Sequence, residues 1–505
     1  MFTLLEGVLE PVNRNQPHTL PKARVEVKHP YLALMGLYLG SFTGMYSETA
    51  LNIALPQLSA TFGVEVSIAQ WIVVGYMLVI GLVLPFTSIL MKCVSARKLT
   101  MIALGAFFAG AVVAGIAPDF ALVLIGRAFQ GIGTGIMLPL MFAMVLEVIP
   151  PHKIGAAMGI TALVVMFATA IGPTLAGILI AAGSWRFIFA SFAVIIAVAM
   201  FFTLKFEVNP YKLTKMRLDA LSAVLSLLGF GGLVLGAGMA SLYGWASPVV
   251  IGLLAVGVVC IALYARRQLA MDTPMLDVRV FALQPFRVGA LCVMVNFGIT
   301  LSVMYILPQY YQNAMLVAVA LTGIIMLPGG VANALVSAAA GRLFDRAGAR
   351  VPALCGFGLS AIAAALLMTT TPDTPLAFVV VCHVLVMIGV PLAMSPCQTH
   401  ALSSLPPELS ADGSTAVNTM QQVLGALCTA VATSILTAGQ SAYFAGGGSD
   451  GALAFSQGSH WGFVFSVALA VIGFLLALRI KPRKSEDAAA NAAPQTAGAQ
   501  AAEGR

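Results

Sequence analysis

The segment "GRLFDRAGARV", residues 341–351, separates two long apolar stretches with a turn that carries three arginines and one aspartate. A second segment, "SILMKCVSARK" at residues 88–98, also joins two apolar stretches through a basic turn. The two segments occupy matching places in the chain. This pattern predicts two repeated halves around a central cavity, a plan that is known among membrane transporters.

The composition indicates a membrane protein. Of the 505 residues, 60% are hydrophobic and only 9% are charged, whereas a soluble chain carries about 25% charged residues. A helix needs about 20 apolar residues to cross the bilayer. The expected fold is therefore an all-α polytopic membrane protein with fourteen transmembrane helices. The stretches are 32–55, 69–91, 99–117, 120–147, 156–182, 187–206, 219–240, 247–265, 288–312, 317–340, 352–370, 375–399, 414–438 and 461–479.

The basic residues predict the orientation of these spans. If the N-terminus lies in the cytosol, only Arg127 and Arg186 of the 26 lysines and arginines fall away from the inner side, as the positive-inside rule requires. An even number of spans places both termini in the cytosol. We expect a cytosolic segment, a six-helix bundle, an inserted helix pair, a second six-helix bundle and a disordered cytosolic tail. The boundaries are 1–29, 30–206, 207–286, 287–480 and 481–505.

Several other classes of protein are excluded. The chain has no Gly-Lys dipeptide, so it lacks a Walker A loop, and H-E-x-x-H is also absent. We therefore expect neither an enzyme nor a cofactor. The seven cysteines are odd in number and form no C-x-x-C motif, which argues against a disulfide or metal framework. The net charge of +7 marks one side of a membrane rather than a nucleic-acid surface.

Five motifs, each on the expected span or loop, resemble those of the major facilitator superfamily, and specifically its fourteen-span drug:proton antiporter branch. Two lie in "QWIVVGYML" at the start of the second span and in "SWRFIF" after the fifth. The second-half loop motif comprises Gly341, Leu343, Asp345, Arg346 and Gly348. The fourth span carries R-x-x-Q-G-x-G as Arg127, Gln130, Gly131 and Gly133, and the fifth carries the antiporter signature G-P-x-x-x-G as Gly172, Pro173 and Gly177.

The chain departs from the family pattern at two places. In the first-half loop, Ser88 replaces a glycine and Lys92 replaces an aspartate, so the usual charge latch is not expected there. In the first span, Ser47 stands where the family has an aspartate, and the acid has moved to Glu48.

Glu48 is the only acidic residue well inside a span. Such a group costs about 2.5–3.5 kcal/mol at mid-membrane when it is ionised. Arg127 and Glu48 each lie seven residues below the outer end of their spans, roughly 10 Å at 1.5 Å per residue. We therefore expect these two charges to meet and to couple transport to protons. The alternative is an ion pair that only fixes helix packing.

Polar side chains at helical spacing are candidates for a mostly apolar substrate cavity, although each one alone is also compatible with simple helix packing. His383 is expected to be a hydrogen-bonded interior residue. The candidates are Tyr76, Gln130, Asn296, Tyr305, Gln309, Asn418, Gln421 and Gln422.

These observations predict a proton-coupled exporter of amphipathic drugs in a bacterial inner membrane. Its partners would be small-molecule substrates, protons and the lipid bilayer, with a periplasmic adaptor only if the source has two membranes. One alternative is a dedicated exporter of a single metabolite or antibiotic, since fold does not settle the substrate. Another is a membrane sensor or scaffold that transports nothing.

Overall fold

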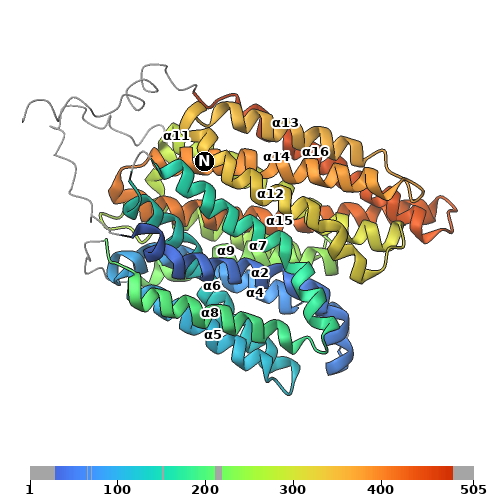
Figure 1. Cartoon of the computed structure of the whole chain (residues 1–505), viewed down its shortest axis with the longest axis horizontal. Coiled ribbons are helices and arrows are strands. Elements are labelled where there is room, and N and C mark those ends of the chain that lie inside the picture. The colour runs from blue at the N-terminus through green and yellow to red at the C-terminus, as the bar shows by residue number, and fades with distance from the viewer. Residues whose placement is uncertain (1–28, 65, 70, 151–152, 211–218, 482–505) are drawn as a thin grey trace, which may run out of the picture.

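The computed structural model describes residues 29–64, 66–69, 71–150, 153–210 and 219–481, and all regular structure in these residues is helical. Figure 1 shows the helices as two bundles side by side. The predicted segment 1–29 and tail 481–505 lie outside the described residues except for His29 and Lys481. The first half contains α2 (Pro30–Phe62), α3 (Val66–Ala69), α4 (Trp71–Cys93), α5 (Ala96–Gly115), α6 (Phe120–Val148), α7 (Ile154–Ala181) and α8 (Arg186–Phe206).

The remaining helices form the inserted pair and the second half. The pair consists of α9 (Ala220–Tyr243) and α10 (Pro248–Ala270), followed by the short η2 (Val278–Ala282). The second half contains α11 (Gln284–Gln309), η3 (Tyr310–Ala314), α12 (Val319–Ala347), α13 (Arg350–Leu367), α14 (Leu376–Ser403), η4 (Pro407–Leu409), α15 (Ser410–Ala445) and α16 (Gly451–Ala477).

The all-helical membrane fold is confirmed. In the described residues, twelve helices are long and apolar enough to cross a membrane, or thirteen when the bent α7 counts as one span. The long α2 is not among them, because its polar residues lower its mean hydropathy. In the described residues, a helix accounts for most of each of the fourteen predicted stretches, which is compatible with fourteen spans.

The helix contacts repeat between the halves. In the first half α6 packs against α2, α4 and α5, and in the second half α14 packs against α11, α12 and α13 in the same way. The halves meet where α7 packs on α12 and α4 packs on α15. The pattern of two similar loops thus corresponds to two similarly packed bundles.

Small residues let these helices approach closely. A Cβ on Gly126 of α6 would lie 2.7 Å from the carbonyl oxygen of Gly110 in α5. The same occurs in the second half, where a Cβ on Gly389 of α14 would lie 2.7 Å from the carbonyl oxygen of Gly356 in α13. Packing of small residues is a main source of helix association in lipid.

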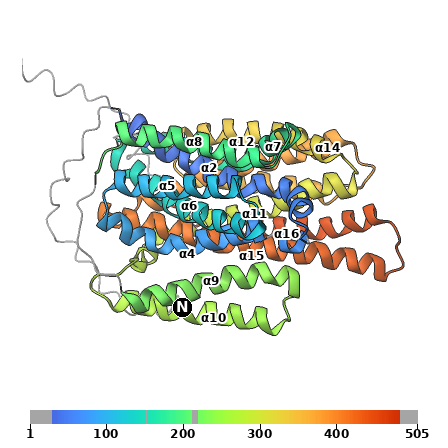
Figure 2. The ribbon, with the colours of Figure 1, turned by 90° about the horizontal axis from the view of Figure 1, so that it is seen from below.

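The inserted pair lies against the seam between the halves, and Figure 2 shows it beside the main bundle. Helix α9 packs on both α4 and α15, and Phe230 and Val234 of α9 form a cluster with Val423 of α15. At one end of the pair, Arg267 and Asp219 form an ion pair of 2.7 Å. Through α9, the pair therefore touches both halves.

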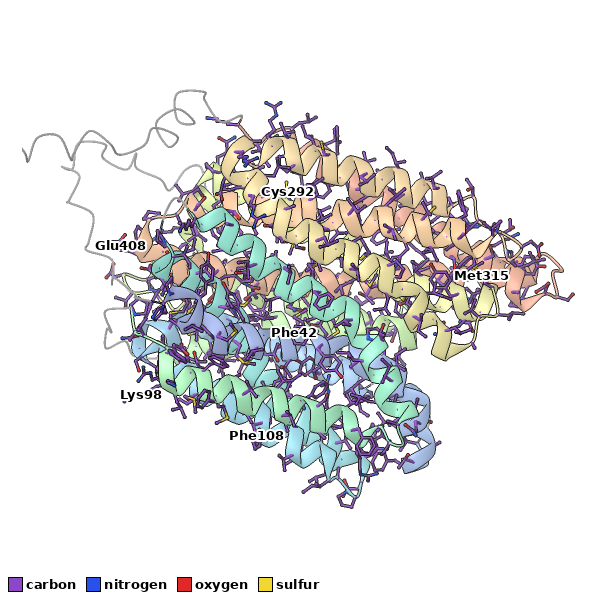
Figure 3. The ribbon with its side chains drawn as sticks, in the orientation of Figure 1. Phe42, Lys98, Phe108, Cys292, Met315 and Glu408 are labelled. Atoms are coloured by element: carbon purple, nitrogen blue, oxygen red, sulfur yellow. The ribbon has the colours of Figure 1, made fainter. Side chains whose placement is uncertain are left out.

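The predicted inner and outer loops lie at opposite ends of the molecule. Figure 3 shows Lys98 and Glu408 at one end and Met315 at the other, with side chains filling the space between the ribbons. The sequence assigns the first two residues to inner loops and Met315 to an outer one. We refer below to the end with Lys98 as the inner end.

Candidate functional site

Arg127 is the centre of a buried polar cluster between α2, α4 and α6. Only 1% of the residue is exposed. Its Nε donates to the carbonyl oxygen of Ile72 at 2.9 Å, and Nη1 donates to Ser47 Oγ at 2.5 Å and to Gln130 Oε1 at 2.8 Å. The guanidinium carbon also lies 3.8 Å from the ring centroid of Tyr76, a cation–π contact that is stronger away from water.

Tyr76 of α4 extends the cluster to Gly44 of α2 and Thr134 of α6. Its hydroxyl donates to the carbonyl oxygen of Gly44 at 2.8 Å and lies 2.7 Å from Thr134 Oγ1. A Cβ on Gly44 would lie 2.7 Å from Thr134 Oγ1, so only glycine leaves room for this arrangement. These hydrogen bonds fix α2, α4 and α6 relative to one another.

Glu48 lies next to this cluster without joining it. The residue is 3% exposed, and neither carboxylate oxygen has a hydrogen-bond partner in the described part of the chain. Glu48 and Arg127 interact electrostatically, but no ion pair joins them among the described residues. The direct contact to Arg127 comes from Ser47 instead, because one residue turns a helix face by about 100°. The shared depth was therefore a sound expectation, and the direct pairing was wrong.

The antiporter signature packs against the turn of α2 that carries Glu48. A Cβ on Gly172 would collide with Thr49 Oγ1 and lie 3.2 Å from the carbonyl oxygen of Tyr46. Helix α7 bends by 41° near this point, as a proline inside a helix allows. The residue after Pro173 is Thr174, and its Oγ1 donates to the carbonyl oxygen of Gly323 in α12 at 2.9 Å. By contrast, a Cβ on Gly177 would meet nothing within 4 Å.

A small cavity lies between the two halves, with room for about one water molecule. Three of the predicted candidates, Asn418, Gln421 and Gln422, line it. Gln398 of α14 also lines it and was missed, although it is the only glutamine in that helix. The remaining lining residues are Met45, Leu138, Phe142, Ala162, Val165, Met166, Phe297 and Met394.

The cavity glutamines have free hydrogen-bonding atoms. Within the described residues, Gln398 Nε2, Gln421 Oε1 and Gln422 Oε1 are buried without partners, whereas Asn418 Nδ2 donates to the carbonyl oxygen of Ser414 at 2.8 Å. Buried polar atoms are normally paired. These atoms therefore suit a ligand that brings its own donors and acceptors.

The other candidates lie elsewhere. Tyr76 and Gln130 belong to the Arg127 cluster, and Asn296 is buried beside the cavity residue Phe297 with its amide atoms unpaired in the described structure. Tyr305 and Gln309 are not cavity-lining residues, and Gln309 Nε2 donates to the carbonyl oxygen of Tyr305 at 3.2 Å. The structure thus separates the eight candidates into two neighbouring groups and an outlying pair.

The second-half loop motif closes the inner end of the α7–α12 contact. Asp345 Oδ2 accepts from the backbone N–H of Ala156 at 3.0 Å. Gly341 lies directly against Gly155 and Gly159 of α7. Gly348 ends α12 with φ = 72°, a value that favours glycine, while Arg346 is exposed.

The first-half loop also forms a latch, contrary to the sequence-based expectation, and its charges are inverted. Lys92 of α4 pairs with Asp412 of α15 at 2.7 Å, and Ser88 Oγ donates to the same carboxylate. Asp412 also accepts from the backbone N–H of Asp277 at 3.1 Å. The acid has therefore moved from the loop to the start of α15, where an acidic group also suits the helix dipole.

The sequence of this chain is similar to those of several known proteins. A family model described as Major Facilitator Superfamily matches residues 37–220 and 216–429. The lincomycin resistance protein LmrB of Listeria innocua is 39% identical over 459 residues, which cover 90% of this chain and 98% of that protein. The multidrug resistance protein Stp of Mycobacterium tuberculosis is 27% identical over 81% of this chain and 76% of its own length.

A solved structure has the same fold. The crystal structure of the human organic anion transporter MFSD10 (TETRAN) superposes with a TM-score of 0.63 at 16% sequence identity. The superposition covers 89% of this chain and 99% of that one.

Proposed function

Because this chain belongs to the major facilitator superfamily, we propose that it exports amphipathic drugs or similar toxic small molecules in exchange for protons. The observation that carries the proposal is Glu48, a buried acid without a hydrogen-bond partner in the described residues, beside the Arg127 cluster. A membrane protein keeps an intramembrane acid mainly where it serves a function.

In this mechanism Glu48 binds the proton and Arg127 sets the local field. An ionised carboxylate without donors is costly to bury, so the closed arrangement suits the neutral acid. When the proton leaves, the negative charge requires compensation, either from Arg127 or from a cationic substrate. Proton and substrate can therefore alternate. A potential of 100 mV contributes about 2.3 kcal/mol for each proton that enters.

The substrate would bind among the residues that line the cavity next to this site, once the two halves have moved apart, because the closed cavity has room for only about one water molecule. Met45 lines the cavity and lies one turn before Glu48 on α2, so residues at this spacing share a helix face. The apolar lining fits an amphipathic molecule, and the unpaired glutamine atoms supply polar contacts. A substrate at the cavity would then sense the charge state of Glu48.

The signature in α7 would prevent leak during exchange. Gly172 lets α7 pack against α2 beside Glu48, and Thr174 binds α12 in the other half. Close contacts on both sides of α7 support a seal between the two halves.

The names of the relatives support a drug as substrate. Stp is named for multidrug resistance, which favours a broad range, whereas the LmrB proteins are named for lincomycin resistance. The second candidate function is therefore a dedicated exporter of one antibiotic or metabolite. A sensor or scaffold that transports nothing remains the third, and it predicts no substrate-dependent proton flux.

The proposed setting is a bacterial inner membrane with both termini in the cytosol, six-helix bundles at 30–206 and 287–480, and an inserted pair at 207–286. The two latches lie at the end that carries the basic loops, which supports this orientation. A periplasmic adaptor would be needed only in a double-membrane source.

The proposal is tested with purified protein in liposomes that contain a pH-sensitive dye. A panel of unrelated drugs, including lincomycin, is added, and proton movement is recorded. Proton movement with several drugs supports the broad exporter, and movement with one compound supports the dedicated exporter. Absence of any drug-dependent movement, with correctly inserted protein, would contradict transport by proton exchange.

A further inference from the structure

His383 in α14 is a buried base that the proposed mechanism has not used. It is 1% exposed, and neither ring nitrogen has a hydrogen-bond partner in the described residues. The expectation of a hydrogen-bonded interior histidine was therefore wrong. The ring edge lies against Gly329 of α12, where a Cβ would lie 2.7 Å from Nδ1 and 2.9 Å from Nε2.

The internal repeat places His383 at the counterpart of Arg127. Arg127 is the eighth residue of α6, and His383 is the eighth residue of α14. Six residues further on, Gly133 and Gly389 each contact the preceding helix of their own half, α5 and α13 respectively.

The facing residues correspond as well. Tyr76 lies twelve residues before Ser88, where the first loop segment begins, and Gly329 lies twelve residues before Gly341, where the second begins. Tyr76 faces Arg127 and Gly329 faces His383. In the first half, the permanently charged Arg127 thus lies against the ring of Tyr76. In the second half, the titratable imidazole of His383 fills the space beside Gly329, which has no side chain.

No acidic group faces His383 from the described elements packed on α14. Helix α7 has no titratable residue, α12 has none before Arg342, and the only acid of α15, Asp412, lies at the inner end. The titratable groups on the other packed elements and on α14 itself are Arg287, Cys292, Tyr305, Tyr310, Tyr311, Arg350, Cys355, Cys382, Cys397, His400, Cys428 and Tyr443.

In this environment, the protonation state of His383 depends on the conformation of the protein. A protonated imidazole without a counter-charge is very costly in the closed arrangement, so the ring is neutral there. Where water reaches the α12–α14 contact, histidine gains a proton near neutral pH. A proton that binds only one conformation also favours that conformation. A role in packing alone is a poor explanation, because an apolar side chain would fill the space without two unpaired nitrogens.

We propose that His383 is a second proton-binding residue of the transport cycle, which serves the second half as Glu48 serves the first. One ring nitrogen accepts a proton from water on the outer side and returns it to water on the inner side in each cycle. The inference rests on the proposed proton exchange. It implies that more than one proton is exchanged for each drug molecule.

The test measures the proton-to-drug ratio in liposomes for the wild type, His383→Gln and His383→Leu. His460→Gln is the matched control, because His460 Nε2 already lies 2.5 Å from the carbonyl oxygen of Thr370. We expect the ratio to fall by about one proton in both His383 variants, since each removes one titratable group, and to be unchanged in the control. Drug movement should also depend less on the outer pH in both His383 variants than in the wild type.

An unchanged ratio and pH profile in His383→Gln would overturn the inference while leaving the proposed function intact. If His383→Leu raises thermal stability without changing the ratio, the residue has only a packing role. If the Gln variant does not fold, the Leu variant and drug-induced proton release in detergent give the same measurement. A wild type without drug-dependent proton movement would instead contradict the proposed function itself.

Discussion

Arg127 holds three elements together through its donors, and this geometry distinguishes arginine from lysine. The guanidinium reaches the Ile72 carbonyl, Ser47 and Gln130 at once. A lysine supplies a charge of similar sign but lacks the planar fork. The charge and the positioning of α2 should therefore be separable by substitution.

We expect Arg127→Ala to abolish drug export and to lower stability by about 1–3 kcal/mol, because it leaves buried polar groups unpaired. Arg127→Lys should keep part of the activity. Drug efflux and thermal unfolding of the two variants provide the measurements. If Lys and Ala are equally inactive in well-folded protein, the fork geometry and not the charge is essential. Equal activity of Ala and wild type would exclude any role.

Glu207 gives the molecule a pH-dependent stability at the inner end. The residue follows α8 and is fully buried, and its Oε1 accepts from Thr100 Oγ1 at 2.7 Å. Burial raises the pKa of this carboxyl from 4.5 to about 7, against the opposing effects of Thr100, Thr203 and Arg97. Below pH 4.5 the group is protonated in both folded and unfolded chains. Between pH 4.5 and 7 the unfolded chain loses its proton first, so stability falls as pH rises.

Glu207→Gln should remove this fall in stability with rising pH. The wild type should lose up to about 3 kcal/mol between pH 4.5 and pH 8, at 1.36 kcal/mol for each pKa unit, and the variant should lose much less. Thermal unfolding in detergent at both pH values measures the difference. Parallel curves for the two proteins would show that Glu207 does not carry the dependence.

Among the helices, the inverted latch between α4 and α15 is the contact that sequence comparison with the family misjudged. The cation, Lys92, lies beside the first-half loop, and the anion, Asp412, lies in the first turn of α15 in the other half. A charge pair of this kind can be exchanged between its two positions. The substitution series is therefore more informative than a single deletion.

Lys92→Asp should weaken closure of the inner end, because it places two carboxylates together. We expect at least a halving of drug export, and labelling of Cys93, the half-buried residue that follows Lys92 at the end of α4, should increase. Lys92→Asp combined with Asp412→Lys should restore most of both properties. A double variant as defective as the single one would mean that the ion pair does not close this end.

The glycines of the α7 signature offer a matched pair. Gly172→Leu should force α7 away from Thr49 and Tyr46 at a cost of about 1–3 kcal/mol, and should impair exchange or cause proton leak. Gly177→Leu is the control, since its Cβ position is open. Proton leak in liposomes without drug measures both. The same leak in the two variants, or in neither, would remove the signature from the mechanism.

Across the whole chain, the sequence predicts the fold better than the site. The two loop segments and the fourteen apolar stretches were sufficient for the helices, because the bilayer requires long apolar spans. The lengths were less well predicted: α2 extends to Phe62 rather than residue 55. Its extra turns contain polar residues, so hydropathy does not mark its end.

The site depends on which way each side chain faces, and the sequence carries this only approximately. Depth placed Glu48 near Arg127 correctly, but the partner is Ser47 because adjacent residues face different ways. Gln398 and the Lys92–Asp412 pair were missed, since both depend on contacts between distant helices. His383 was misjudged for the same reason: its lack of partners is visible only in three dimensions.

The proposed proton exchange depends on Glu48 more directly than on any other residue. The decisive comparison is drug-driven proton movement in liposomes for wild type, Glu48→Gln and the control Glu207→Gln, with equal insertion confirmed. The expected result is proton movement in the wild type and in the control, and background signal in Glu48→Gln. Wild-type proton movement by Glu48→Gln would contradict the mechanism proposed for this transporter.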